Sequence, residues 1–376
     1  EFTNVKTIYS GYGFLAEDYS FAEKCKESGF KNIGPNSENI RLMGDKITAK
    51  KTMTDLGVPC VPGSTEAVET VTNAKEIAKE LGYPVLIKAS AGGGGRGMKL
   101  VTNSDELPEA FHAAKKESAA AFNNDAIYIE KYLLNPKHIE IQIFGDGLGN
   151  AVHLGERDCS IQRRHQKILE EAPSTVLTHK IRQHIGEICA NAIASLKYSG
   201  AGTIEFLYSN GEFYFIEMNT RIQVEHPITE QIFGVDLVKE QIRVASKENL
   251  SFQQEKIHFR GHAIECRINA EKIPEFSASP GLITAYHAPG GLGVRIDSAL
   301  YAGYEIPPYY DSLVAKLIIH GKNRNECLLR LSRALDEFVI GNIETTIPLH
   351  QKLLMSSEFL DGEYNINWLE SKFLAT

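Results

Sequence analysis

The spacing of hydrophobic and polar residues predicts a mixed α and β protein with antiparallel hairpins. In 73–81 and 181–196, apolar residues recur every three or four positions, as on the buried face of a helix. A further helix is expected at 19–28. Shorter apolar runs bounded by glycine, proline or polar residues predict strands at 85–88, 98–102, 202–208 and 213–219. Strands and helices do not alternate regularly, so the pattern does not favour a parallel βαβ sheet.

The composition is that of a globular protein, because 43% of the 376 residues are hydrophobic and 23% are charged. Lys and Arg number 40 against 48 Asp and Glu, and this net charge of −8 argues against a general nucleic-acid-binding surface. The six cysteines lie at least 30 positions apart, without the spacing of a zinc site or a redox pair. No apolar stretch approaches the roughly 18 residues of a membrane-spanning helix. We therefore expect a cytoplasmic protein that binds neither nucleic acid nor membranes.

A run of glycines at 92–97 has the spacing GxGxxG. A dinucleotide-binding turn needs a helix after this run, whereas strands are predicted here on both sides of it. A P-loop needs Gly-Lys-Ser/Thr at its end, and Arg96-Gly97-Met98 does not supply it. We therefore interpret the run as a flap whose backbone N–H groups approach phosphate oxygens, with Lys88 as a further charge. A flexible surface loop is the alternative.

Two carboxylates, Glu205 and Glu217, lie on the predicted hairpin, and the length of its loop decides whether they share a face. A two-residue turn at 210–211 would send them to opposite faces. A three-residue loop at 209–211, with Gly211 in a left-handed bulge, would keep them as diagonal neighbours on one face. We predict the three-residue loop.

Asn219 and Arg221 would continue the face that carries these carboxylates. Carboxylate and amide oxygens are ligands that Mg²⁺ prefers, so this face is predicted to hold a metal that bridges phosphates. The alternative is a solvated charged face. The segment 217–227 is dense in polar groups and favours the functional interpretation, because it would build a poor core but gather donors, a base and metal ligands. The segment 156–167 is similarly dense in anion donors, and a solvated strand or loop is its alternative.

Five segments together resemble biotin carboxylase, an ATP-grasp enzyme of the biotin-dependent carboxylases. They are 88–98 (Lys-Ala-Ser-Ala-Gly-Gly-Gly-Gly-Arg-Gly-Met), 156–167 (Glu-Arg-Asp-Cys-Ser-Ile-Gln-Arg-Arg-His-Gln-Lys), 217–227 (Glu-Met-Asn-Thr-Arg-Ile-Gln-Val-Glu-His-Pro), 261–271 (Gly-His-Ala-Ile-Glu-Cys-Arg-Ile-Asn-Ala-Glu) and 309–313 (Tyr-Tyr-Asp-Ser-Leu). The resemblance extends over essentially the whole chain. The ending at 364–370 is most similar to the separate bacterial biotin carboxylase subunit of acetyl-CoA carboxylase.

The resemblance implies an ATP-grasp fold of the α/β (mixed α+β) class. The expected parts are the second half of an N-terminal α/β domain (1–45), a linker and lid domain with the glycine flap (46–133), and a large C-terminal region with an antiparallel sheet (134–376). A family member would carry a further α/β segment before this sequence begins, so we expect the N-terminal domain here to be incomplete.

The resemblance also implies the reaction. ATP and bicarbonate, with Mg²⁺ or Mn²⁺, would form carboxyphosphate, and CO₂ from it would carboxylate biotin on a biotin carboxyl carrier protein. This is the first half-reaction of acetyl-CoA carboxylase, in fatty acid biosynthesis. The implied partners are the carrier protein and carboxyltransferase subunits, with a homodimer in the intact protein. The alternatives are the corresponding part of another acyl-CoA or pyruvate carboxylase, a carbamoyl-phosphate synthetase half, and a nucleotide-binding fragment without turnover.

Individual residues receive roles from the same resemblance. Glu225 would be the general base for bicarbonate, Arg221 would hold the anion, and Arg267 would stabilise the biotin enolate. The catalytic and substrate-binding residues would be Lys167, Arg221, Gln223, Val224, Glu225 and Arg267. The metal ligands would be Glu205, Glu217 and Asn219. The nucleotide-binding residues would be Lys46, Lys88, Gly93, Gly94, Gly95, Met98, Glu130, Lys131, Leu133, His138, Gln162, His165 and Leu207.

The strand expected around Arg267 permits its role, because Glu265, Arg267 and Asn269 would share one face. A structural pair between Arg267 and Glu265 is the alternative. Two departures from the family pattern occur: Tyr9-Ser10 stands where His-Pro is usual, and Ala91 replaces the first usual glycine of the flap. The chain also lacks an Ala-Met-Lys-Met segment, so biotin would arrive on a separate carrier protein or domain.

Overall fold

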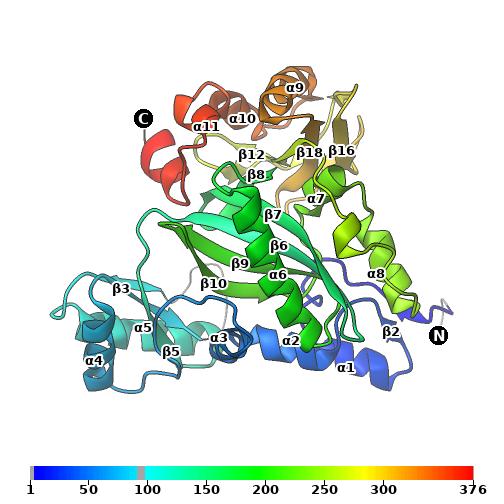
Figure 1. Ribbon diagram of the computed structural model, residues 1–376. Coiled ribbons are helices and arrows are strands. Elements are labelled where there is room, and N and C mark those ends of the chain that lie inside the picture. Colours follow the sequence, from blue (N-terminus) through cyan, green and yellow to red (C-terminus); the bar gives the residue numbers. More distant parts are fainter. Residues whose placement is uncertain (1–3, 91–97, 376) are drawn as a thin grey trace. The chain divides into compact units, whose positions relative to one another are not determined.

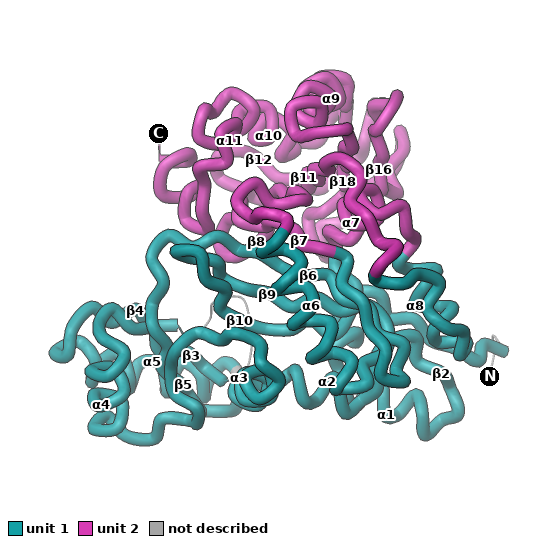
Figure 2. Tube along the Cα trace, in the orientation of Figure 1, with its two compact units in different colours: residues 1–154, 180–223, 237–254 teal, residues 155–179, 224–236, 255–376 magenta. Residues whose placement is uncertain are grey.

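The computed structural model describes residues 4–90 and 98–375, and shows helices and antiparallel sheets in a mixed α/β arrangement (Figure 1). The chain forms two compact units (Figure 2). Unit 1 comprises residues 1–154, 180–223 and 237–254, and unit 2 comprises residues 155–179, 224–236 and 255–376. The chain therefore passes from unit 1 to unit 2 directly after Gln223. Within the described residues, no helix is both long and apolar enough to span a bilayer.

The beginning of unit 1 is a short parallel strand pair with three helices. The elements are β1 (Thr7–Ile8), α1 (Tyr19–Glu27), β2 (Lys31–Asn32), α2 (Ser37–Gly44) and α3 (Lys46–Asp55). Each helix begins after a residue whose side chain accepts a hydrogen bond from a backbone N–H of the first turn: Asp18, Asn36 and Asp45. The helix predicted at 19–28 is confirmed as α1.

A small antiparallel sheet follows, with the strand order β4-β3-β5. Its elements are α4 (Val71–Leu81), β3 (Val85–Ala89), β4 (Lys99–Val101), α5 (Leu107–Phe122) and β5 (Ile127–Lys131). Helices α4 and α5 pack against the sheet, and their contact is a core that includes Ala74, Ala78, Ile87, Leu107 and Ile129. The helix and the strands predicted here are confirmed. Residues 91–97, which hold Ala91 and the predicted flap glycines Gly93, Gly94 and Gly95, lie outside the described residues.

Unit 1 also contains antiparallel strands in the order β10-β9-β6. The remaining elements of this unit are β6 (Lys137–Asp146), the first residues of β7 (Ala151–Arg163), α6 (His179–Ser195), β9 (Ser199–Ser209), β10 (Glu212–Asn219) and α8 (Leu237–Ala245). Helix α6 confirms the helix predicted at 181–196. The helix approaches His153 closely at Gly186. A Cβ at this position would stand only 2.4 Å from the ring Nδ1 of His153, so the approach requires glycine.

The hairpin β9–β10 differs from the prediction in its turn. Ser209 pairs with Glu212, so the loop has two residues, Asn210 and Gly211, with φ of 53° and 85°. The predicted three-residue loop is wrong, because Asn-Gly suits the tight turn that matches the twist of the two strands. A β-bulge lies between Phe215 and Glu217, however.

The bulge restores the relationship that the loop was expected to provide. It adds Ile216 to β10, so that Glu217 lies directly opposite Glu205 rather than one residue out of register. Residues directly opposite each other in an antiparallel pair share a face. The two carboxylates therefore lie on one face, as predicted, by a different route.

Unit 2 is built on antiparallel strands in the order β7-β8-β11-β18-β16. Its elements are β8 (Gln166–Ala172), α7 (His226–Phe233), β11 (His262–Asn269), β12 (Glu271–Lys272), β13 (Ser277–Ala278), β14 (Gly281–Leu282), β15 (Tyr286–His287), β16 (Val294–Ser298), β17 (Glu305–Ile306), β18 (Leu313–Gly321), α9 (Arg324–Glu337), β19 (Val339–Ile340), α10 (Ile347–Leu353), α11 (Ser357–Asp361) and a terminal π-helix, η2 (Leu369–Phe373). A 3₁₀ helix, η1 (Gln254–Lys256), lies where the chain re-enters this unit.

Strand β11 has the alternation that the sequence predicted. Ile264, Cys266 and Ile268 enter the core of unit 2, which also contains Leu331 and Leu349. The residues between them, including Arg267, therefore lie on the other face of the strand. Burial of the aliphatic side chains on one face of β11 therefore determines the direction of the Arg267 side chain.

Candidate active site

Three carboxylates form a row across the strands β6, β9 and β10 of unit 1. Glu140 pairs with Glu205, and Glu205 pairs with Glu217, so all three share one face. Like charges opposite one another destabilise a sheet unless a cation compensates them. Lys46 approaches Glu217 to 3.5 Å, and the side chain of Glu217 is 39% exposed.

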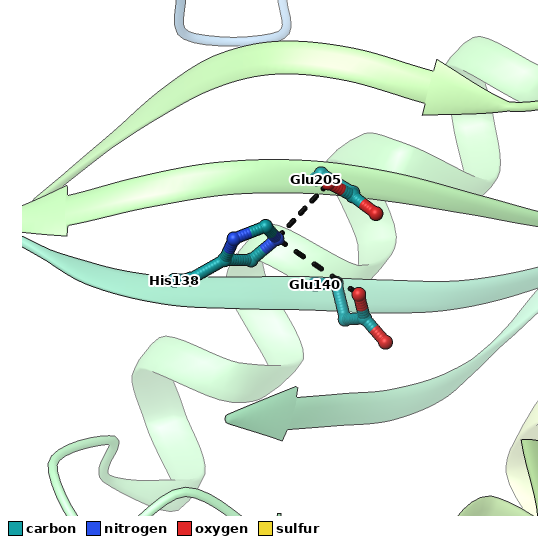
Figure 3. A group of neighbouring side chains, drawn as sticks. All are labelled: His138, Glu140 and Glu205. Carbon is teal, nitrogen blue, oxygen red and sulfur yellow. Dashed lines mark ion pairs between the residues drawn. The ribbon is translucent and has the colours of Figure 1, made fainter. Parts of the chain in front are cut away.

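His138, Glu140 and Glu205 are buried and point toward one another (Figure 3). His138 Nε2 lies 3.0 Å from Glu205 Oε2 and 4.0 Å from Glu140 Oε2. One ligand atom from each of the three residues lies within 4.8 Å of the others. This group could hold a metal ion, and the carboxylate oxygens suit a hard divalent cation.

Glu205 is also the acceptor for two amide side chains. Its Oε1 accepts hydrogen bonds from Asn219 Nδ2 at 2.9 Å and from Gln223 Nε2 at 2.7 Å. The structure thus brings the predicted ligands Glu205 and Asn219 into contact, with the predicted substrate-binding residue Gln223 beside them. Leu207, a predicted nucleotide residue, lies opposite His138 on the same sheet.

Arg221 is fixed by contacts on both sides of its guanidinium. Its Nη2 donates to Asn219 Oδ1 at 2.8 Å, and its Nε donates to Glu17 Oε2 at 2.8 Å. Glu17 Oε1 also accepts from the backbone N–H of Thr220 at 3.0 Å. Glu17 was not predicted as a site residue. It lies 204 positions from Arg221, and nothing in its own segment indicates the contact.

A second charged group in unit 1 centres on Glu130 of β5. Glu130 is buried and lies 2.7 Å from Lys88 Nζ and 3.0 Å from Lys50 Nζ. Burial raises the pKa of Glu130, but Lys88 and Lys50 outweigh it and hold the pKa below its usual value. Lys88 and Glu130 were both predicted for the nucleotide site, whereas Lys50 was not.

The remaining predicted nucleotide residues of unit 1 lie around the small sheet. Lys131 Nζ donates to the backbone oxygen of Gly82 at 2.7 Å, which fixes the end of β5. Leu133 follows β5, and Met98 precedes β4; both are partly buried.

In unit 2, the predicted base Glu225 lies directly before α7 and is buried. Its Oε1 lies 2.6 Å from Lys167 Nζ, and its Oε2 lies 2.9 Å from Arg267 Nη2. Burial raises the pKa of Glu225, but Lys167 and Arg267 outweigh it, so the pKa lies well below its usual value. Glu225 is therefore an ionised carboxylate held by two cationic donors, and these donors set how strongly it can attract a proton.

Arg267 is held by two carboxylates, on different nitrogens. Besides the contact with Glu225, its Nε donates to Glu170 Oε1 at 2.7 Å. Burial disfavours the charged guanidinium, but Glu170 and Glu225 outweigh it and raise the pKa of Arg267. The alternative of a pair between Arg267 and Glu265 is thus replaced by two other partners.

The other predicted residues of unit 2 occupy the β7–β8 hairpin and its surroundings. Gln162 pairs with Lys167 across the hairpin, and its Nε2 donates to Cys159 O at 2.9 Å. His165 lies in the exposed turn with φ of 63°. The carbonyl oxygen of Val224 accepts a hydrogen bond from Lys316 Nζ at 2.8 Å.

Sequence reasoning missed Glu140 and Glu170, and a signal existed for each. Along 138–143, polar and isoleucine residues alternate strictly, which indicates a polar face on a strand. Glu170 stands in Ile-Leu-Glu-Glu-Ala, where two adjacent carboxylates lie between apolar residues and require partners if the segment is buried. Neither signal identifies the partner, because Arg267 lies 97 positions from Glu170.

Of the departures from the family pattern, Tyr9 has a defined contact. Its hydroxyl donates to Gln241 Oε1 at 3.0 Å within unit 1. The Tyr-Ser sequence therefore has a structural partner on α8.

Comparison with known sequence families gives three matches along the chain. Residues 1–40 match the biotin carboxylase N-terminal domain, residues 45–253 match the ATP-binding domain of the carbamoyl-phosphate synthase L chain, and residues 265–371 match the biotin carboxylase C-terminal domain. The chain is 56% identical to a biotin carboxylase of Haemophilus influenzae over 373 residues, which is 99% of this chain and 83% of the relative. It is 53% identical to a pyruvate carboxylase subunit of Methanothermobacter thermautotrophicus, over 98% of this chain and 76% of the relative.

Solved structures are similar over nearly the whole chain. A complex of Campylobacter jejuni biotin carboxylase with β-γ-ATP has a TM-score of 0.94 and 46% identity, covering 97% of this chain and 82% of the other. The biotin carboxylase domain dimer of Hydrogenobacter thermophilus 2-oxoglutarate carboxylase, with MgADP, ADP and bicarbonate, has a TM-score of 0.93 and 50% identity, covering 97% of this chain and 81% of the other.

Proposed function

The chain belongs to the biotin carboxylase family of ATP-dependent ligases, and from that membership we propose which of its residues carry out the carboxylation of biotin with ATP and bicarbonate. The fold is of the ATP-grasp type. Within it, we take 1–45, 46–133 and 134–376 as the N-terminal part, the lid and the C-terminal region. The observation that carries the proposal is the buried Glu225 carboxylate between Lys167 and Arg267.

Bicarbonate activation is assigned to Glu225 and Arg221. Glu225 would take the proton of bicarbonate as the bicarbonate oxygen attacks the γ-phosphorus of ATP, and ADP would leave. Arg221 would hold the anion; the contacts of its guanidinium with Asn219 and Glu17 support a fixed orientation. Gln223 and Val224 would complete the bicarbonate site.

The second step is assigned to Arg267. Carboxyphosphate would break down to CO₂ and phosphate, phosphate would take the proton from biotin N1′, and N1′ would attack CO₂. Negative charge would then develop on the ureido oxygen of biotin, and a guanidinium donor would stabilise it. The position of Arg267 on the polar face of β11 supports this role.

The nucleotide and metal are assigned chiefly to unit 1. Glu205, Glu217 and Asn219 would hold Mg²⁺ or Mn²⁺, and their oxygen donors, with the row of opposed carboxylates, fit such an ion. When bound, the metal would neutralise phosphate charge. The phosphates and the base would be bound by Lys46, Lys88, Glu130, Lys131, Leu133, His138 and Leu207, with Met98 and the glycines 93–95, and by Gln162 and His165 of unit 2.

The proposal extends to partners. We propose that biotin arrives on a biotin carboxyl carrier protein, that carboxyltransferase subunits complete an acetyl-CoA carboxylase, and that the intact protein is a homodimer. The dimer of the similar Hydrogenobacter domain supports the last point. Similarity to part of a pyruvate carboxylase keeps another acyl acceptor as an alternative.

The test is ADP release that depends on both bicarbonate and free biotin, compared between the parent protein and Glu225→Gln. We expect Glu225→Gln to lose nearly all turnover while it retains nucleotide binding. Glu255→Gln, an exposed carboxylate in η1, is the matched control and should retain activity. Bicarbonate-dependent ADP release that ignores biotin would instead favour a carbamoyl-phosphate type of ligase, and nucleotide binding without turnover would indicate a binding module.

A further inference from the structure

The guanidinium of Arg267 contacts two carboxylates, and the proposed reaction protonates only one of them. Glu225 contacts Nη2 at 2.9 Å and Glu170 contacts Nε at 2.7 Å. Glu225 would become protonated during bicarbonate activation, and a neutral carboxylic acid no longer forms an ion pair. Glu170 has no part in the proposed chemistry and would keep its contact throughout.

Glu170 is in a rigid place. It lies on β8, a strand with neighbours on both sides, and is fully buried. Glu170 pairs directly with Glu265 on β11, two residues before Arg267. The strand pairing therefore fixes the distance between the Glu170 and Arg267 backbones.

The backbone of Arg267 is fixed as well. Its carbonyl oxygen accepts hydrogen bonds from Thr346 Oγ1 and from His350 Nε2, each at 2.9 Å. With the backbone and the Nε edge held, the Nη end of the side chain is what remains adjustable. The side chain is 17% exposed, so its contact with solvent is limited.

The charges around Arg267 make Glu170 the remaining counterion when Glu225 is neutral. Burial raises the pKa of Glu265 well above its usual value, which disfavours the ionised form of this carboxyl as a counterion. The pKa of Glu170 is raised to about 7, because burial and the charge of Glu225 outweigh Arg267 and Lys167. When Glu225 is neutral its repulsion is lost, and the ionised form of Glu170 beside Arg267 is favoured. Among the described residues, Glu170 Oε2 has no hydrogen-bond partner, so its contact with Arg267 is the main compensation for burying a carboxylate.

We propose that Glu170 is a positioning residue for the biotin half of the reaction: it holds the Nε edge of Arg267, so that the Nη atoms keep their orientation toward the biotin ureido oxygen after Glu225 takes up a proton. The inference rests on the proposed function, because it assigns to Arg267 the stabilisation of the biotin enolate. It adds a residue that acts through Arg267 and not on the substrate.

The test compares two activities of Glu170→Gln. The amide oxygen of Gln can still accept from Nε, so the variant removes the charge while it keeps the shape of the site. We expect biotin-dependent carboxylation to fall roughly 10- to 100-fold in kcat/KM for free biotin, as for a misplaced catalytic group. Bicarbonate-dependent ATP cleavage measured without biotin should stay within about twofold, because Glu225 and Arg221 are untouched. Equal loss of both activities, or no loss of either, would overturn the proposal.

Two further variants separate positioning from folding. Glu171→Gln changes the adjacent buried carboxylate, which contacts His262 and Arg324 instead, and should lower the melting temperature without a selective effect on biotin. If Glu170→Gln does not fold, Glu170→Asp is tested instead. We expect a smaller loss of biotin-dependent carboxylation, with ATP cleavage in the absence of biotin again spared. Equal loss of both activities, or no loss of either, would count against the proposal.

These results remain distinguishable from failure of the proposed function. If the parent protein releases ADP without any dependence on biotin, the proposed function itself is wrong. If the parent protein is biotin-dependent and Glu170→Gln matches it in both activities, only the role of Glu170 is refuted.

Discussion

Lys167 Nζ lies 2.6 Å from Glu225 Oε1, although the two residues are 58 positions apart in the chain. Lys167 belongs to a strand hairpin and Glu225 to the start of a helix. Both side chains are largely shielded from water, so the ion pair is little screened. The contact keeps Glu225 ionised and also sets how readily it gains a proton. A general base acts best when its pKa suits the operating pH.

Removing Lys167 should move the acidic limb of the pH–rate profile. Lys167 lowers the pKa of Glu225, so Lys167→Gln should raise that pKa. On acidification, the variant should therefore lose activity at a higher pH than the parent protein does. The measurement is the bicarbonate-dependent rate of ADP release from the lowest pH at which both proteins stay folded up to about pH 9. Lys352→Gln, at an exposed position, is the control. A lower rate with an unmoved limb would show that Lys167 does not tune the base.

Arg267→Ala should abolish carboxylation of biotin while nucleotide binding persists. The guanidinium contacts Glu170 and Glu225 of unit 2, and no proposed nucleotide role depends on it. Carboxybiotin formation and the Kd for ATP are measured on the same preparation. The assignment would be contradicted by a variant that no longer binds nucleotide.

Glu205→Gln should raise the Mg²⁺ concentration needed for half-maximal activity by roughly 10- to 100-fold, as expected for altering a metal site. The amide retains an oxygen acceptor for Asn219 and Gln223, so the local hydrogen bonds can persist. A Mg²⁺ titration of ADP release gives the shift. Glu212→Gln, an exposed carboxylate on the adjacent strand β10, should leave the titration unchanged. An unaltered Mg²⁺ requirement in Glu205→Gln would remove Glu205 from the metal site.

Acid should destabilise the fold through His350. Burial lowers the pKa of His350 to about 4 from 6.5, so between these values the folded protein binds fewer protons than the unfolded chain. The free energy of unfolding should therefore increase by on the order of 3 kcal/mol as the pH rises from about 4 to about 6.5. The same stability is lost when the pH falls back through this range. Urea unfolding across this pH range tests it. His350→Gln should flatten the dependence, and an equally steep curve in that variant would exclude His350 as the cause.

Local pattern was sufficient for much of the fold. The alternation of 263–269 predicted the polar face that carries Arg267. Successive side chains of a strand point to opposite faces, so burial of the aliphatic residues places the others on the opposite face. The helices at 19–27 and 179–195 followed from apolar spacing in the same way.

Contacts between distant parts of the chain could not be predicted in this manner. Glu17 with Arg221, Lys50 with Glu130, and Glu170 with Arg267 are each set by tertiary packing across 80 or more positions. A carboxylate seen alone in a sequence fits a solvated surface as well as a site. The register of β9–β10 was mispredicted for a related reason. The bulge falls at the end of the uninterrupted apolar and aromatic run 213–216, where no alternation of polar and apolar residues reveals it.

The extra residue at Ile216 has a consequence for protein engineering. Continued without interruption, the pairing that begins with Ser209 and Glu212 would set Glu217 against Ile204 and direct its carboxylate to the opposite surface. A designer who transplants Glu205 and Glu217 into another hairpin with an Asn-Gly turn must therefore transplant the irregularity as well. An idealised version of this hairpin would keep both glutamates in its sequence and lose the site that they form together.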